Sequence, residues 1–130
     1  MKHILYVEDD VDDQSLFEEA LDVLGVPVNY DIAADGYTAI EKLNTPPPVD
    51  LVLLDLNMPI LNGFETLRTI KQTDGLKHIP VYILSTSASQ KDIEKCHELG
   101  AKGFITKPTD FEVYCQKLSA VLRKELKIVA

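Results

Sequence analysis

Residues 51–59 read LVLLDLNMP, and this stretch decides the fold of the chain. Its uninterrupted apolar residues are typical of a central strand buried on both faces, and Pro59 cannot continue such a strand. Asp55 therefore lies at the exit of the strand, with apolar walls behind it and a loop in front. Because an uncompensated buried ion costs several kcal/mol, Asp55 needs either a charge partner or a chemical role.

The composition sets the class of protein. The chain has 130 residues, of which 45% are hydrophobic, so we expect one domain with its own core. The net charge of -8 argues against nucleic-acid binding, which needs clustered Lys and Arg. The apolar runs are far shorter than the roughly 18 residues of a membrane span, and Met1 leads into a strand-like segment instead of a signal peptide. We expect a cytoplasmic protein that makes no membrane contact.

Strand-like and helix-like segments alternate along the chain. The expected strands are residues 4–7, 28–33, 51–55, 80–84 and 103–106. Apolar residues at helical spacing predict a helix after each strand, and Asn62, Ser89 and Thr109 are expected helix caps, each with an acidic residue three positions later. Five strands alternating with five helices predict an α/β fold, a doubly wound five-stranded parallel sheet with helices on both faces.

Polar side chains follow four of these strands. They are Glu8 and Asp9 after the first, Asp55 after the third, Ser85 and Thr86 after the fourth, and Thr106 and Lys107 after the fifth. In a doubly wound sheet, ligands bind beyond the carboxyl ends of the strands, so we expect these residues to converge. Asp12 and Asp13 are interpreted as solvated residues of a helix start.

The charges in this group indicate its chemistry. Two carboxylates about 4 Å apart repel by on the order of 4 kcal/mol, and Lys107 alone cannot neutralise three of them. A hard divalent cation with oxygen ligands would do so, and Mg²⁺ fits best. Asp55 then becomes a nucleophile of the kind that forms aspartyl-phosphates. Ser85 and Lys107 could each bind one phosphoryl oxygen.

At these residues the chain resembles the receiver domains of bacterial two-component response regulators, stand-alone chemotaxis-type members included. The resemblance rests on YVEDD at 6–10, LVLLDLNMPILNG at 51–63, PVYILSTSA at 80–88 and GAKGFITKP at 100–108. It implies a single receiver domain over residues 1–130, with the flavodoxin-like strand order 2-1-3-4-5. The STS pattern at 85–87 looks most like the small regulators that partner phytochrome-type kinases.

The resemblance also implies roles for the acidic residues and the lysine. Asp55 is the expected phosphoacceptor, and Asp9 and Asp55 are expected Mg²⁺ ligands, with Glu8 acting through water. The backbone carbonyl of Asn57 is a further expected ligand, and Lys107 falls on the phosphoryl-binding lysine. Glu8 stands where many relatives have Asp, so its longer side chain can shift the water shell of the ion.

Two further pairs of positions carry implied roles. Ser85 falls on the Ser/Thr switch position and Phe104 on the aromatic switch position, which often carries Tyr; plain core packing is the alternative for Phe104. Asn57 and Ser87 occupy positions that tune water access and hence the lifetime of the phosphoryl group. Lys107 precedes Pro108, so a cis bond is permitted there.

The expected function is that of a single-domain response regulator and not an enzyme, apart from its own phosphorylation and dephosphorylation. A histidine kinase or phosphotransfer protein would supply the phosphoryl group, and the output would be a protein contact, as a monomer or a phosphorylation-dependent homodimer. The main alternative is a phosphorylation-independent adaptor. A haloacid-dehalogenase-like phosphatase needs a second Asp where Asn57 stands, and an FMN binder needs a phosphate-cradling loop where residues 8–13 are acidic.

The cysteines and histidines indicate no further site. Cys96 and Cys115 are too few for a disulfide framework and are expected to be reduced, half-buried helix residues. His3, His78 and His97 show no ligand spacing and are expected to be surface or packing residues.

Overall fold

The computed structural model describes residues 1–56, 62–86 and 89–128. Strands and helices alternate throughout these ranges. The elements are β1 (Lys2–Val7), α1 (Val11–Leu24), β2 (Val28–Ala33), α2 (Gly36–Leu43), β3 (Leu51–Leu54), α3 (Gly63–Gln72), β4 (Val81–Ser85), α4 (Gln90–Glu98), β5 (Gly103–Thr106) and α5 (Phe111–Leu126).

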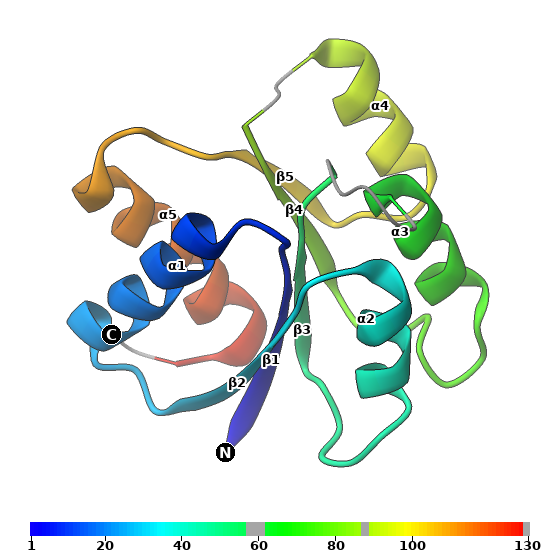
Figure 1. Cartoon of the computed structure of the whole chain (residues 1–130), viewed down its shortest axis with the longest axis horizontal. Helices are drawn as coiled ribbons and strands as arrows, with labels where there is room; N and C mark the ends of the chain where they lie inside the picture. Colours follow the sequence, from blue (N-terminus) through cyan, green and yellow to red (C-terminus); the bar gives the residue numbers. More distant parts are fainter. Residues whose placement is uncertain (57–61, 87–88, 129–130) are drawn as a thin grey trace.

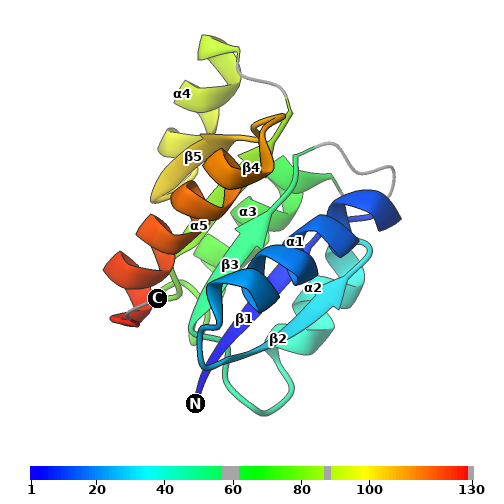
Figure 2. The same cartoon turned by 90° about the vertical axis from the view of Figure 1, so that its left-hand side faces the viewer.

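The five strands form one parallel sheet in the order β2-β1-β3-β4-β5, which confirms the expected topology. Helices α1 and α5 cover one face of the sheet, and α2, α3 and α4 cover the other (Figure 1). Figure 2 shows α1 and α5 side by side in front of the sheet. No helix in the described ranges combines the length and apolarity needed to cross a membrane.

Two hydrophobic cores flank the sheet, and β3 contributes to both. Leu51 and Leu53 pack on the side of α1 and α5, whereas Val52 and Leu54 pack on the side of α2, α3 and α4. Successive strand side chains point to opposite faces, so a strand covered on both faces needs an apolar residue at every position. This requirement explains the unbroken apolar run that ends at Asp55.

Two of the three expected helix caps are confirmed. Asn62 and Ser89 cap α3 and α4 by accepting the amides of Glu65 and Asp92, as expected. The expected cap at Thr109 is wrong. Asp110 has the extended backbone of a cap and accepts the amide of Val113 at 3.1 Å, so α5 starts one residue later.

The cysteines are more deeply buried than the sequence suggested. Cys96 and Cys115 are free thiols with exposed fractions of 1% and 8%. Each faces one of the two cores, which corrects the expectation of half-buried residues. His3 is a buried packing residue whose Nε2 lies 2.9 Å from Asp31 Oδ2, whereas His78 and His97 are exposed.

Candidate functional site

The carboxyl ends of the strands are held together by main-chain hydrogen bonds that continue past the strands. The amide of Asp55 donates to the carbonyl of Val7 at 3.0 Å, and the amide of Lys107 donates to the carbonyl of Ser85 at 2.7 Å. These bonds fix the residues just beyond the strand ends relative to one another. An open depression lies there, lined by Glu8, Asp9, Asp10, Asp13, Asp55, Thr86 and Lys107.

Three carboxylates form the centre of the site. Glu8, Asp9 and Asp55 each bring one oxygen to within 4.8 Å of the other two. Glu8 and Asp55 are buried, with exposed fractions of 1% and 5%, whereas Asp9 is exposed at the rim. Closely spaced carboxylate oxygens are the ligands that a hard divalent cation prefers, so the residues present fit such an ion.

Lys107 supplies a positive charge on one side of the carboxylates. Its ammonium forms ion pairs with Glu8 and with Asp13, and the Asp13 Oδ2 distance is 2.9 Å. The Asp55 Oδ1 atom is further away, at 4.0 Å. Burial lowers the pKa of the Lys107 ammonium, but the hydrogen bonds to Glu8 and Asp13 outweigh burial and the pKa is raised. Lys107 is therefore a permanent cation held on the α1 side of the site.

The protein balances the charge of Glu8 only in part. Burial raises the pKa of its carboxyl to about 7, although the hydrogen bond and charge of Lys107 and the hydrogen bond from Tyr6 oppose this shift. The charge of Asp55 adds to the increase. A cation bound beside Glu8 would favour the ionised form of this carboxyl.

The interpretation of Asp13 as a solvated residue is wrong, because its carboxylate pairs with the Lys107 ammonium. Helix α1 begins at Val11, with Asp10 as its cap, and its first turn carries Asp13 back to Lys107. Asp12, in the same turn, is exposed as expected. The short distance in sequence between the end of β1 and the start of α1 was the signal that could have identified Asp13. A helix that begins at residue 11 keeps its first turn close to the end of β1 and therefore close to the site.

Two partners of Glu8 were also missed. The hydroxyl of Tyr6 donates to Glu8 Oε1 at 2.9 Å, and the side-chain amide of Gln14 donates to the Glu8 carbonyl at 2.7 Å. Tyr6 reads as an ordinary core residue in an apolar strand, so its sequence position gave no sign of a polar role.

Ser85 and Phe104 lie on the same side of the sheet. Ser85 is fully buried at the end of β4, and Phe104 packs against the core beside α2, α3 and α4. The register pairs Ile83 with Phe104 and Ser85 with Thr106, so Ser85 and Phe104 are diagonal neighbours on adjacent strands. Thr86 is exposed at the rim of the depression. The expected positions at Asn57 and Ser87 lie outside the described residues.

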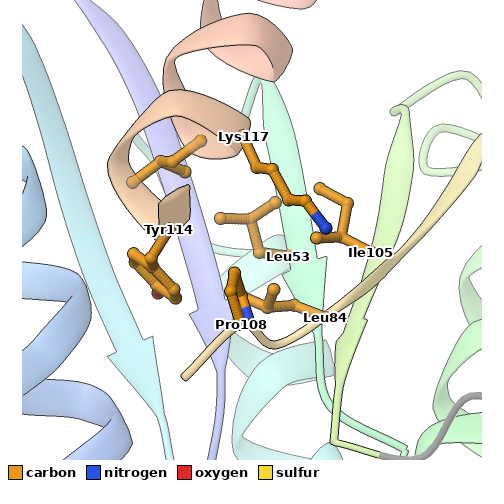
Figure 3. A pocket seen from close by; sticks show the side chains of 7 residues that line it. Leu53, Leu84, Ile105, Pro108, Tyr114 and Lys117 are labelled. Carbon is orange, nitrogen blue, oxygen red and sulfur yellow. The ribbon is translucent and has the colours of Figure 1, made fainter. Parts of the chain in front are cut away.

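Pro108 anchors the segment that carries Lys107. It lies with Leu84, Ile105 and Tyr114 around a small apolar cavity beside α5 (Figure 3). The cavity volume of about 10 Å³ is at most that of one water molecule, so this is packing and not a ligand pocket. Within the described ranges the cis peptide bond is Pro46–Pro47, and the Lys107–Pro108 bond is trans.

Comparisons with known proteins agree on one family. The protein-family model described as response regulator receiver domain matches residues 4–119 of this chain. Response regulator Rcp1 of Synechocystis sp. is 39% identical over 113 residues, which cover 82% of this chain and 76% of that protein. Transcriptional regulatory protein CpxR of Escherichia coli is 36% identical over 124 residues, or 95% of this chain, but the chain spans only 50% of CpxR.

Solved structures give the same result. The crystal structure of the Mn²⁺-bound form of Rcp1 has a TM-score of 0.85 and 32% identity, and covers 95% of this chain and 93% of that one. The phosphorylated cyanobacterial phytochrome response regulator RcpA has a TM-score of 0.88 and 35% identity, with coverages of 96% and 94%. The chain belongs to the response regulator receiver domain family of two-component systems.

Proposed function

We propose that the protein is a single-domain response regulator that accepts a phosphoryl group on Asp55. The observation that carries this proposal is the position of Asp55, a buried carboxylate just beyond β3, next to two further carboxylates and 4.0 Å from the Lys107 ammonium. The family assignment argues against the phosphatase and flavin-binding alternatives.

A divalent cation, Mg²⁺, is the proposed cofactor. Asp9, Asp55 and the backbone carbonyl of Asn57 would hold it, with Glu8 acting through water. The carboxylate cluster supports this assignment, as does the Mn²⁺ bound to the related Rcp1. When bound, the cation would neutralise charge on the transferred phosphoryl group.

The phosphoryl group would come from a phosphohistidine on a sensor histidine kinase or a phosphotransfer protein. An Asp55 carboxylate oxygen attacks the phosphorus in line with the leaving nitrogen, so the O–P bond forms as the N–P bond breaks and the imidazole leaves. The Lys107 ammonium and the Ser85 hydroxyl stabilise charge on the equatorial oxygens. Hydrolysis of the acyl phosphate later restores Asp55, at a rate that Asn57 and Ser87 tune.

Phosphorylation would act through Ser85 and Phe104. The phosphoryl group adds about two negative charges, which draw the Ser85 hydroxyl toward Asp55. Because Ser85 and Phe104 are diagonal neighbours on β4 and β5, this movement would let Phe104 change its packing. The readout surface would be formed by α4, β5 and α5, and the output would be contact with a downstream protein.

The partners are proteins, not nucleic acids or membranes. We propose a cytoplasmic receiver domain over residues 1–130 that acts as a monomer or as a phosphorylation-dependent homodimer. The related RcpA is a cyanobacterial phytochrome response regulator, which supports a phytochrome-type kinase as the phosphodonor.

The test is phosphorylation of the wild type and of Asp55→Asn by acetyl phosphate with Mg²⁺, followed by intact-mass spectrometry. We expect one added phosphoryl group on the wild type and none on the variant. Asp31→Asn, a change at a carboxylate on β2 away from the site, should be labelled like the wild type. Absence of Asp55-dependent labelling with acetyl phosphate and with a panel of histidine kinases would instead favour the phosphorylation-independent adaptor.

A further inference from the structure

Tyr6 places a buried hydroxyl at the site. Its ring lies in the core between the sheet and α1, with an exposed fraction of 0%. The Phe17 ring of α1 packs against it with the ring centroids 4.7 Å apart. Because the ring is confined by the sheet and by Phe17, the position of the hydroxyl is fixed by packing.

The Tyr6 hydroxyl gives the two carboxylate oxygens of Glu8 different hydrogen-bond partners. Glu8 Oε1 accepts hydrogen bonds from the Tyr6 hydroxyl and from the Lys107 ammonium. Glu8 Oε2 accepts a longer bond of 3.3 Å from the amide of Asp10. A carboxylate oxygen has two lone pairs, so two strong donors occupy Oε1 and leave Oε2 with the free capacity.

The length of the Glu8 side chain makes this arrangement possible. Tyr6 and Glu8 are two residues apart in one extended segment, so their side chains lie on the same side of the sheet. Aspartate at position 8 would carry its carboxylate on a chain shorter by one methylene and would withdraw it from the tyrosine. The hydroxyl of Tyr6 and the glutamate at position 8 therefore form a matched pair.

We propose that Tyr6 is a positioning residue of the metal site, whose hydroxyl works with Lys107 to hold Glu8 Oε1 and to present Oε2 to the divalent cation or its water shell. This inference rests on the proposed cation site at Glu8, Asp9 and Asp55. Residues that orient a ligand through a hydrogen bond commonly change metal affinity by about 10-fold or more when they are removed.

The experiment compares Tyr6→Phe with Tyr82→Phe. Tyr82 is a matched control because it is also a buried strand tyrosine whose hydroxyl donates to a glutamate, Glu125, but it does not line the site depression. Both variants keep the aromatic ring that the core requires. Mg²⁺ is titrated into each protein and its dissociation constant is measured from amide chemical shifts; urea unfolding in EDTA reports stability separately.

We expect Tyr6→Phe to weaken Mg²⁺ binding by about 10-fold, and Tyr82→Phe to bind as the wild type does. In a Glu8→Asp background, adding Tyr6→Phe should leave the dissociation constant unchanged, because the shorter carboxylate no longer contacts the hydroxyl. A merely structural tyrosine would lower stability without this dependence on residue 8.

The outcomes separate the two proposals. If the wild type binds Mg²⁺ and Tyr6→Phe binds it equally well, the positioning role is overturned and the metal site stands. The positioning role is also overturned if Tyr82→Phe weakens Mg²⁺ binding as much as Tyr6→Phe does. It is likewise overturned if Tyr6→Phe weakens Mg²⁺ binding equally in the Glu8→Asp background. If the wild type binds no Mg²⁺, the metal site itself is overturned, and the role of Tyr6 falls with it.

Discussion

Lys107 is bound to Asp13, which lies 94 residues earlier in the chain, with 2.9 Å between Nζ and Oδ2. The same ammonium lies 4.0 Å from Asp55 Oδ1. The first turn of α1 therefore competes with the proposed phosphoacceptor for the lysine of the site. A phosphoryl group on Asp55 would have to attract Lys107 away from this helix or share it.

Replacing Asp13 by Asn should speed phosphorylation. The change removes one anion from the depression and one competitor for Lys107, so we expect acetyl phosphate to label Asp55 faster by about fivefold, the rate equivalent of about 1 kcal/mol. Asp12→Asn is the matched control, because it removes the same charge from an exposed position in the same turn. Equal acceleration by both variants would attribute the effect to net charge instead of to Lys107.

Gly63 should tolerate no side chain. A Cβ atom at this residue would collide with the carbonyl oxygen of Asp55 and the Cα of Leu56, because α3 starts directly against the end of β3. These contacts are backbone atoms that cannot rotate away, so Gly63→Ala should lower the free energy of unfolding by about 2 kcal/mol or more. Urea unfolding measures this value, and Arg68→Ala, at an exposed position of the same helix, should have little effect. A fully stable Gly63→Ala protein would contradict the close approach.

The stability of the metal-free protein should depend on pH through Glu8. The pKa of its carboxyl is raised in the folded protein from 4.5 to about 7, chiefly by burial. The folded state therefore holds a proton that the unfolded state has lost, and its stabilising effect is complete below about pH 4.5 and disappears as the pH rises through about 7. The loss should be at most about 3 kcal/mol.

This dependence is measured by urea unfolding in EDTA from pH 5 to pH 8. Glu8→Gln cannot ionise at this position, so its stability should fall less over the same range. Saturating Mg²⁺ should weaken or reverse the trend in the wild type, because a cation favours the ionised carboxylate. An identical pH profile for Glu8→Gln would assign the trend to another group.

Removing the Lys107 side-chain charge should make the stability of the folded protein depend more strongly on Mg²⁺. Lys107→Met leaves the buried carboxylates of Glu8 and Asp55 without their cation, so we expect a loss of about 3 kcal/mol or more at pH 8 in EDTA. Mg²⁺ should then stabilise this variant more than it stabilises the wild type. Lys102→Met is a suitable control, because Lys102 also pairs with a partly buried glutamate, Glu125, but away from the site. If Mg²⁺ stabilised both variants to the same extent, Lys107 and the cation would not share the same carboxylates.

Local signals account for the parts of the structure that were predicted well. The apolar run of β3 and the caps at Asn62 and Ser89 depend on residues within a few positions of one another. The cap of α5 was assigned to the wrong residue because Thr109 and Asp110 are adjacent and both can cap. Only the extended backbone of Asp110 and its bond to Val113 distinguish them.

The residues of the site also fall into those that the sequence could predict and those that it could not. Position at a strand end was enough to select Glu8, Asp9, Asp55 and Lys107, because a parallel sheet brings all such ends to one edge. The contacts of Asp13 and Tyr6 could not be selected in this way. The contact of Asp13 depends on the direction in which α1 leaves β1, and the contact of Tyr6 depends on the packing of its ring against Phe17.

By itself, the sequence determined the alternation of elements, the parallel sheet and the group of charged residues at its edge, because periodicity, caps and breakers act over short distances. Only the tertiary structure decided which carboxylates share Lys107, which oxygen of Glu8 is occupied and how closely Gly63 approaches Asp55. Those relationships join residues that are far apart in the chain, and they depend on side-chain lengths and helix directions within about an ångström, which no pattern of residue types encodes.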